Sequence, residues 1–350
     1  MKRIQLIIGN KMAKNIAISR YYGFKNFGDE AILKVLTTEL KSRNYNITVF
    51  SKSPTDTAKQ LGVNCVYTFG IKNIIKTLKN VDVLFSGGGS LLQDTTSIKS
   101  LFYYLFVIAV ALFFKKDVII FAQGIGPIRS FAGKIFTSLL LKKCKYVTVR
   151  DEKSLELLKS WRIKAIAVSD PVWGLDLSNT NSTGTVGIQL RSWKNLSNEY
   201  LKKLARHICE HFADKDINIY SFQDSLDLDI CRKFEWMLKD FKPELRTKVL
   251  SNLSIDEILK SFSELEYLVA MRYHACLLAM KLGIPTVALS YDTKVEKLAQ
   301  KFSLPCSNLD TNENIDEIIK QIFDINKQEI FEKAKEYKFD FENFVNAIEA

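Results

Sequence analysis

Short apolar runs rich in β-branched residues alternate with amphipathic stretches along most of this chain, and this alternation limits the possible folds more than any other feature. The first half contains strand-like runs that read NIAIS, ITVF, VDVLFSG, DVIIFAQG and KYVTVRD. The alternation then restarts with VGIQLR, INIYSF, KVLSNL, YLVAMR and TVALSY. Strands that alternate with helices pair in parallel, and such sheets bind ligands at the carboxyl ends of their strands. The sequence therefore predicts an α/β fold in which two Rossmann-like parallel-sheet domains face a cleft.

A polar stretch rich in Asn, Ser, Thr and Gly separates the two patterns and predicts a domain boundary. We expect a linker at 178–185, an N-terminal domain at 12–177 and a C-terminal domain at 186–350, whose terminal helices are able to cross back to the first domain. A chain of 350 residues is long enough for two cores of this size. Residues 1–11 start with basic residues but lack the apolar region and cleavage site of a signal peptide, so we expect a disordered extension outside the fold.

Basic residues are concentrated in the first part of the chain. Residues 1–150 hold 23 Lys and Arg against 7 Asp and Glu, whereas residues 151–350 hold 27 against 32. The first part thus carries +16 and the rest −5. This asymmetry indicates either a surface that meets an anionic partner or lysine-rich helices that are simply solvated. No nucleic-acid-binding motif accompanies the charge, so nucleic acid is disfavoured, and an anionic membrane surface or substrate stays open.

The cysteines and the most apolar segment indicate a cytoplasmic protein. The six cysteines form no C-x-x-C pair and no disulfide framework, which is typical of a reducing compartment. The apolar run at 101–114 has 14 residues and as a helix would span about 21 Å, whereas a bilayer core is about 30 Å thick. We therefore expect a buried helix there and a cytoplasmic location, with peripheral attachment at the inner face of the membrane left open by the charge.

Two motifs in the first half bring backbone amides or carboxylates to the end of a strand. The motif SGGGSLLQD, at 86–94, follows a strand and precedes a helix, so its glycines would let a ligand approach the backbone amides. A tight turn explains the glycine run equally well when it is taken alone. The motif YYGFKNFGDEAIL, at 21–33, delivers Asp29 and Glu30 to a helix start. Capping of that helix by Asp29 is the structural alternative to a role in binding.

Cationic residues follow the predicted strands of the second half. Arg191 comes after the strand VGIQL, Arg272 and His274 come after YLVAM, and Lys294 comes after TVALSY. Because the carboxyl ends of parallel strands meet at one edge, these side chains could embrace a small dianion, with His274 as proton donor. A lone histidine is usually structural, but one next to an arginine at a strand end is a better candidate for function.

The remaining two histidines belong to the stretch RHICEH. His207, Glu210 and His211 have the H-x-x-E-H spacing of inverted zinc proteases. The helix around them buries Leu201 and Leu204, which puts the histidines on its flank and Glu210 toward solvent. We therefore interpret this segment as a surface helix, and the sequence predicts no metal site.

An ordered set of motifs resembles the polysaccharide pyruvyl transferase family, and specifically its branch that modifies cell-wall polymers with ketals for S-layer attachment. The motifs are YYGFKNFGDEAIL, SGGGSLLQDTTS, AQGIGPI, VRDEKSLELL, SDPVW, MRYHACLLAMKLGIP and SYDTKVEKL, which together span about residues 14–300. The resemblance implies a two-domain GT-B-like fold and phosphoenolpyruvate as donor substrate, with no cofactor. This chain has Tyr273 where the family usually has leucine in R-L-H, and HACLLAM where HSLIFA is more typical.

The resemblance also implies roles for the residues named above. The R-x-H pair implies Arg272 and His274, with His274 as the acid, and the arginine after the first strand of the second domain implies Arg191. Arg191, Arg272 and Lys294 would then hold the donor. From its position at the helix start, Asp29 is a further catalytic candidate, because either Asp29 or Glu30 would act as the base. The expected acceptor-side residues are Asp29, Glu30, Gly88, Gly89, Ser90 and Asp94. The acceptor would be a saccharide in a cell-wall or surface polymer, or its polyprenyl-diphosphate-linked precursor at an anionic membrane surface. The alternatives are a GT-B glycosyltransferase that uses a nucleotide sugar and a saccharide-binding protein without activity.

Overall fold

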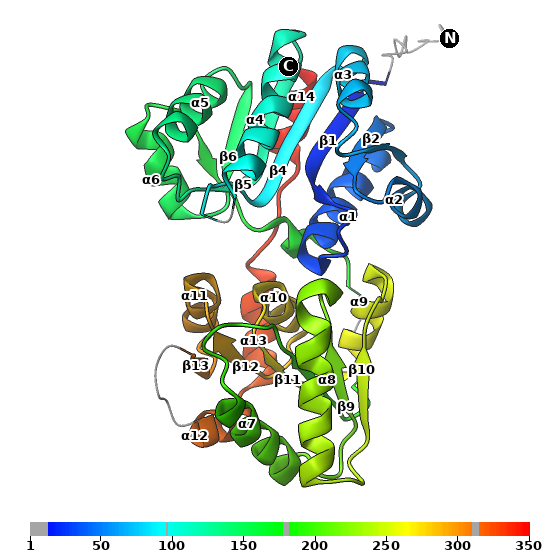
Figure 1. The fold of residues 1–350 in the computed structure, drawn as a ribbon, viewed down its shortest axis with the longest axis vertical. Helices are drawn as coiled ribbons and strands as arrows, with labels where there is room; N and C mark the ends of the chain where they lie inside the picture. Colours follow the sequence, from blue (N-terminus) through cyan, green and yellow to red (C-terminus); the bar gives the residue numbers. More distant parts are fainter. Residues whose placement is uncertain (1–12, 96, 178–181, 310–314) are drawn as a thin grey trace, which may run out of the picture. The chain divides into compact units, whose positions relative to one another are not determined.

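The chain forms two parallel β-sheets, each packed between helices (Figure 1). The computed structural model describes residues 13–95, 97–177, 182–309 and 315–350. The first compact unit contains the described residues up to Gly23, together with Leu36–Val168 and Phe341–Ala350, and the second contains Phe24–Val35 and the described part of Ser169–Asp340. The predicted extension at 1–11 lies outside the described residues. The predicted linker at 178–185 stays a prediction, because residues 178–181 also lie outside them.

The first sheet has seven strands in the order β3-β2-β1-β4-β5-β6-β7, with every neighbouring pair parallel. Its strands are β1 (Asn15–Tyr22), β2 (Asn46–Ser51), β3 (Asn64–Tyr67), β4 (Val83–Leu92), β5 (Asp117–Ile125), β6 (Tyr146–Val149) and β7 (Ile166–Ala167). The intervening helices are α1 (Phe27–Ser42), α2 (Pro54–Leu61), α3 (Ile71–Asn80), α4 (Ile98–Phe113), α5 (Phe131–Leu141) and α6 (Glu152–Ser160). The strand order reverses between β1 and β4, which makes their carboxyl ends the switch point of this sheet.

The second sheet has six parallel strands in the order β10-β9-β8-β11-β12-β13. Its strands are β8 (Thr185–Gln189), β9 (Ile217–Tyr220), β10 (Thr247–Leu250), β11 (Leu265–Ala270), β12 (Thr286–Ser290) and β13 (Cys306–Asn308). Its helices are η1 (Pro171–Gly174), α7 (Asn198–His211), α8 (Asp224–Phe241), α9 (Ile255–Ser263), α10 (Tyr273–Leu282), α11 (Thr293–Phe302), α12 (Ile315–Lys320), η2 (Gln321–Asp324) and α13 (Lys327–Lys335). Here the order reverses between β8 and β11.

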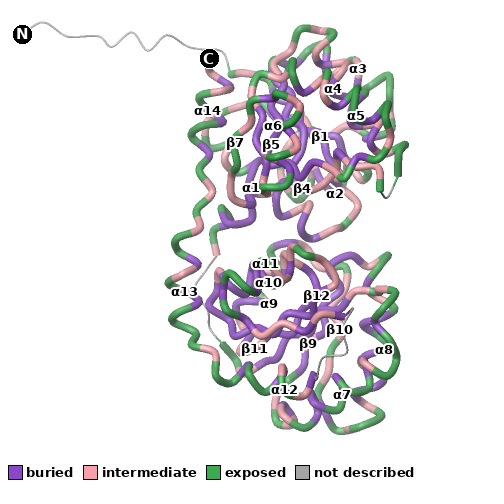
Figure 2. Tube along the Cα trace, turned by 90° about the vertical axis from the view of Figure 1, so that its left-hand side faces the viewer, coloured by how far each residue is buried: buried purple, intermediate pink, exposed green. Residues whose placement is uncertain are grey.

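Each unit has its own apolar core (Figure 2). The central strands are apolar on both faces, as expected for a parallel sheet covered by helices on each side. In β1, for example, Ile16, Ala17 and Ile18 are all fully buried. The last helix, α14 (Glu342–Glu349), belongs to the first unit, because the ring of its Phe344 contacts those of Phe85 and Phe121 in the first sheet.

The apolar run at 101–114 lies almost entirely within α4, as predicted. One side of this helix is buried in the first core through Leu101, Leu105 and Ile108. Within the described residues, no helix is both long enough and apolar enough to cross a bilayer.

Candidate functional site

The switch point of the second sheet brings the predicted cationic residues to neighbouring strands. Strands β8 and β11 pair so that Gln189 lies opposite Ala270. The buried side chain of Gln189 accepts a hydrogen bond from the backbone N–H of Arg272 at 2.8 Å. In turn the backbone N–H of Arg191 lies 3.2 Å from Sδ of Met271. These contacts hold the segments that follow the two strands against each other.

Arg272 forms a buried ion pair with Asp227 of α8. Its Nε and Nη2 atoms donate to the two carboxylate oxygens at 2.8 and 2.6 Å. Asp227 is fully buried and also accepts from the backbone N–H groups of Phe222 and Gln223. Burial raises the pKa of Asp227, and the guanidinium of Arg272 opposes that shift. Arg272 therefore anchors the β11–α10 turn to α8, a role that its place in the sequence did not reveal.

His274 lies in the first turn of α10 and faces a second buried carboxylate. Its Nε2 atom is 3.6 Å from Oδ2 of Asp170, whose side chain is only 3% exposed. This distance is too long for a hydrogen bond, so the carboxylate lies beside the ring without a direct bond to it. Asp170 also accepts from the backbone N–H of Val172 at 3.0 Å, which fixes it at the start of η1. The motif SDPVW contains Asp170, but no sequence pattern pairs that residue with His274.

The other ring nitrogen of His274 lies against Gly28 in α1. A Cβ atom on Gly28 would be 2.0 Å from Nδ1 of His274, closer than any real contact of this kind. The imidazole thus occupies the space of the missing side chain. This close approach explains why a glycine stands at the helix start in the motif at 21–33.

The start of α1 belongs with the second unit and is capped by Asn26. The Asn26 side chain accepts from the backbone N–H groups of Gly28 and Asp29 at 3.1 and 3.4 Å, so Asn26 takes the capping position that the structural alternative gave to Asp29. The backbone N–H of Phe27 donates to the carbonyl of Phe222 at 2.9 Å. Because of such contacts Asp29 and Glu30 group with the unit that contains His274, whereas the sequence pattern placed them in the other domain.

Replacing Gly28 with alanine is expected to lower catalytic turnover. Helix propensity alone would make this change stabilising by about 1 kcal/mol. The clash with His274, the candidate proton donor, predicts instead a loss of roughly 10²-fold in kcat, because a shift of about 1 Å in a group that takes part in the chemistry has an effect of this size. The matched control is Gly70→Ala, where φ is −81° and the nearest atom to a new Cβ is 3.2 Å away. Equal kcat values for the two variants would contradict this account of Gly28.

Arg191 and Lys294 complete the cationic residues near this switch point. The Nη1 atom of Arg191 donates to the hydroxyl of Tyr291 at 3.1 Å, and its guanidinium lies 5.4 Å from the centre of that ring. Tyr291 directly follows β12, the neighbour of β11. Lys294 lies in the first turn of α11, whose N-cap Asp292 accepts from the Lys294 backbone N–H at 2.9 Å. Both cations therefore lie just beyond the carboxyl ends of the strands.

The glycine run of the first unit lies within a strand and not in a tight turn, the alternative that the sequence had left open. Strand β4 continues through Gly87, Gly88 and Gly89 with φ angles of +124°, +81° and +79°, which favour glycine. A Cβ on Gly89 would lie 2.0 Å from a guanidinium nitrogen of the buried Arg20 at the end of β1. The run therefore lets an arginine approach the strand backbone at the switch point between β1 and β4.

Two further acceptor-side candidates have partners within the first unit. Ser90 accepts a hydrogen bond from Nη2 of Arg150 at 3.0 Å. The carboxylate of Asp94 accepts from the backbone N–H groups of Arg129 and Ser130, each at 2.7 Å. Hydrogen bonds from Ser130 and from the amide of Arg129 lower the pKa of Asp94 to about 2. Asp94 thus fixes the loop that precedes α5, and Arg150 is a cation at this edge that the sequence motifs did not single out.

The histidines of α7 are arranged differently from the predicted surface helix. Ligand atoms of His207, Glu210 and His211 lie within 4.8 Å of one another. His207 is buried rather than on the flank, because its Nε2 atom contacts the carboxylate of Asp316 in α12, while Glu210 is exposed as expected. The contact ties α7 to α12 and lies apart from the strand ends described above.

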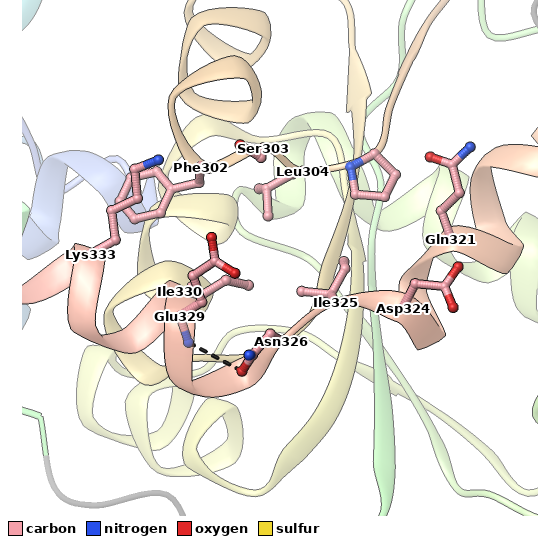
Figure 3. A pocket seen from close by; sticks show the side chains of 11 residues that line it. Phe302, Ser303, Leu304, Gln321, Asp324, Ile325, Asn326, Glu329, Ile330 and Lys333 are labelled. Carbon is pink, nitrogen blue, oxygen red and sulfur yellow. Dashed lines mark hydrogen bonds between the residues drawn. The ribbon is translucent and has the colours of Figure 1, made fainter.

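A pocket of about 350 Å³ lies beside α11, η2 and α13 (Figure 3). Its charged lining residues are Asp324, Glu329 and Lys333, which gives two carboxylates for one cation. It contains none of the predicted site residues. We therefore do not assign an anionic donor to this pocket.

A comparison with protein families covers the stretch of chain that holds most of these residues. The family model described as polysaccharide pyruvyl transferase matches residues 26–293. The chain belongs to this family. The matched range begins at the α1 cap, Asn26, and includes Asp170, Arg191, Arg272 and His274 of the site. No curated protein matches the chain significantly in sequence.

Solved structures similar to this family member confirm the predicted GT-B-like fold. A putative UDP-N-acetylglucosamine 2-epimerase from Listeria monocytogenes aligns with a TM-score of 0.66 at 11% identity, covering 96% of each chain. A glycosyltransferase from Rickettsia africae aligns with a TM-score of 0.62 at 11% identity, covering 97% of this chain and 98% of the other. HepE from Anabaena, solved with UDP and glucose, gives 0.61 at 11% identity, covering 96% and 98%. At such low identity these similarities establish the fold alone.

Proposed function

We propose that the protein transfers a pyruvyl group from phosphoenolpyruvate to two hydroxyls of a sugar, forming a cyclic ketal and releasing phosphate. The observation that carries the proposal is the placement of His274 against the buried carboxylate of Asp170, at a switch point that also holds Arg191. Family membership supports the reaction class. The acceptor sugar would belong to a cell-wall or surface polysaccharide of the kind that anchors an S-layer, or to its lipid-linked precursor.

The chemistry of the donor defines what the site must supply. Protonation of the methylene carbon of phosphoenolpyruvate gives an oxocarbenium-like centre at C2, which one sugar hydroxyl attacks. The C2–O bond to phosphate then breaks, and the second hydroxyl bonds to C2. Of the two hydroxyl protons, one replaces the proton that became part of the methyl group, and the other leaves with phosphate. The balanced products are therefore one ketal and one inorganic phosphate.

Each candidate residue has a role in this scheme. His274 is the acid, and the buried carboxylate of Asp170 lies 3.6 Å from its Nε2 atom. Arg191 and Lys294 hold the carboxylate and phosphate of the donor. Arg272 contributes positive charge from its place beside Asp227, and it positions the turn that carries His274. Asp29 is the base, and Glu30, Gly88, Gly89, Ser90 and Asp94 remain proposed contacts of the acceptor.

A donor experiment separates this function from its alternatives. Purified protein should release phosphate from phosphoenolpyruvate only when an acceptor is present, such as a β-linked N-acetylmannosamine or galactose glycoside. Arg191→Ala should raise the KM for phosphoenolpyruvate more than it lowers kcat, because its guanidinium binds the donor in ground and transition states alike. Saturable binding of UDP or GDP by calorimetry, with no phosphate release, would favour a nucleotide-sugar transferase. Saccharide binding without turnover, unchanged by His274→Ala, would favour a non-catalytic binding protein.

A further inference from the structure

The outer face of α5 is apolar although it is not covered by any described part of the chain. Phe131, Ile135 and Leu139 recur every four residues along one side of this helix, with Phe136 beside them. Their exposed fractions are 80%, 40%, 53% and 49%. The opposite side, which includes Thr137 and Leu141, is buried. A contiguous exposed apolar strip marks an interaction site, so the outer side of α5 is a candidate docking surface.

Helix α4 extends this apolar surface. The ring of Phe102 in α4 contacts that of Phe136 in α5, with centroids 6.0 Å apart. Phe106 and Phe113 lie four and eleven residues after Phe102 and so share its side of the helix. Phe113 is 79% exposed. Figure 1 shows α4 lying along β4 and β5 with α5 beside it. We call the six exposed side chains the α4–α5 face: Phe106, Phe113, Phe131, Ile135, Phe136 and Leu139.

Basic residues outnumber acids around the α4–α5 face, although the carboxylate of Asp94 lies against the backbone that precedes α5. Residues 95–150 hold nine Lys and Arg and a single acid, Asp117, which pairs with Lys145 at 2.7 Å. The exposed lysines at the ends and sides of the two helices are Lys99, Lys115, Lys134, Lys142 and Lys143. An apolar strip with a cationic border is the pattern by which peripheral helices bind anionic bilayers.

We propose that the α4–α5 face binds the surface of an anionic phospholipid bilayer, with its aromatic and aliphatic side chains inserted among the lipids. A second copy of the chain fits the face less well, because pairing two such faces would bring their cationic borders together. The biological purpose of this binding rests on the proposed function, because it would bring the enzyme to a lipid-linked saccharide at the membrane.

Vesicle binding tests the proposed role of the α4–α5 face without any transfer assay. A negative result would therefore leave the proposed pyruvyl transfer untouched, and the reverse also holds. The full chain is sedimented with vesicles of phosphatidylcholine and phosphatidylglycerol in a 7:3 ratio, and with vesicles of phosphatidylcholine alone. Binding is expected only to the anionic vesicles, and 1 M NaCl should weaken it. The triple variant Phe131→Ser, Phe136→Ser, Leu139→Ser should lower the partition coefficient at least about tenfold. The matched control Trp236→Ser removes a side chain of α8 that is 63% exposed, and it should leave the partition coefficient unchanged.

A second readout keeps the test decisive if the triple variant folds poorly. The variant Phe131→Trp should show a blue-shifted difference emission on adding anionic vesicles, and brominated lipid should quench it. Equal vesicle binding by the wild type and a folded triple variant would overturn the proposal. A Phe131→Trp variant whose tryptophan emission is neither shifted nor quenched would also overturn it. The same holds if sedimentation velocity shows that the α4–α5 face mediates self-association while its substitution leaves vesicle binding unchanged.

Discussion

Replacing His274 with alanine is expected to lower kcat for acceptor-dependent phosphate release by about 10²- to 10⁴-fold, the range that a positioned acid contributes. The imidazole lies between a buried carboxylate and the backbone of Gly28. In the proposed mechanism it donates a proton, and alanine has none to donate. The melting temperature should change little, because the His274 side chain is 18% exposed and has no hydrogen bond to its neighbour Asp170. Initial rates over a range of phosphoenolpyruvate concentrations measure the effect.

A second histidine variant provides the control for this prediction. The ring of His211 in α7 contacts Phe323 and lies apart from the strand ends. The variant His211→Ala should therefore retain wild-type turnover. Asp170→Asn should also reduce kcat, because it removes the carboxylate that lies beside the ring of His274. A His274→Ala enzyme that keeps more than a tenth of wild-type kcat would remove His274 from the role of acid.

Replacing Asp227 with alanine is expected to destabilise the protein by about 3–5 kcal/mol, because it leaves the guanidinium of Arg272 buried without its counter-ion. The same change removes the acceptor of two backbone N–H groups in the β9–α8 loop. Urea unfolding followed by circular dichroism measures the loss. Activity should fall as well, since Arg272 sets the turn that carries His274.

An exposed ion pair in the same unit gives the comparison. Asp256→Ala breaks a contact with Lys34, but the Asp256 side chain is 78% exposed, so the loss should be below about 1 kcal/mol. The double variant Asp227→Leu, Arg272→Met should recover much of the stability lost in Asp227→Ala, because it removes both charges and leaves no unpaired charge buried. Equal losses for Asp227→Ala and Asp256→Ala would show that the buried pair does not anchor the turn.

The sequence predicted the architecture because its signals are local. Buried parallel strands read as continuous apolar runs, and the residues that follow them, such as Arg191, Arg272 and His274, can be located from those runs alone. The apolar α4 was likewise recognised from its length. Each of these features can be recognised from a stretch of about ten residues of sequence.

The rest of the site depends on contacts between distant segments. Asp227 and Arg272 are 45 residues apart in the chain, and the sequence around Asp227 does not indicate that it pairs with Arg272. Asn26 rather than Asp29 caps α1, because the helix begins earlier than its acids suggest. The glycine run stays in a strand since Arg20, more than sixty residues earlier, fills the space beside it. Pairing of this kind becomes visible only in the folded chain.

The most direct test of the central claim follows the pyruvyl carbons themselves. The protein is incubated with phosphoenolpyruvate carrying ¹³C at C2 and with a saccharide acceptor, and the products are examined by NMR and by phosphate assay. The account predicts a labelled ketal carbon bonded to two sugar oxygens, formed in equal amount with inorganic phosphate and absent with His274→Ala. Label that remains in phosphoenolpyruvate, while a nucleotide sugar glycosylates the same acceptor, would contradict it.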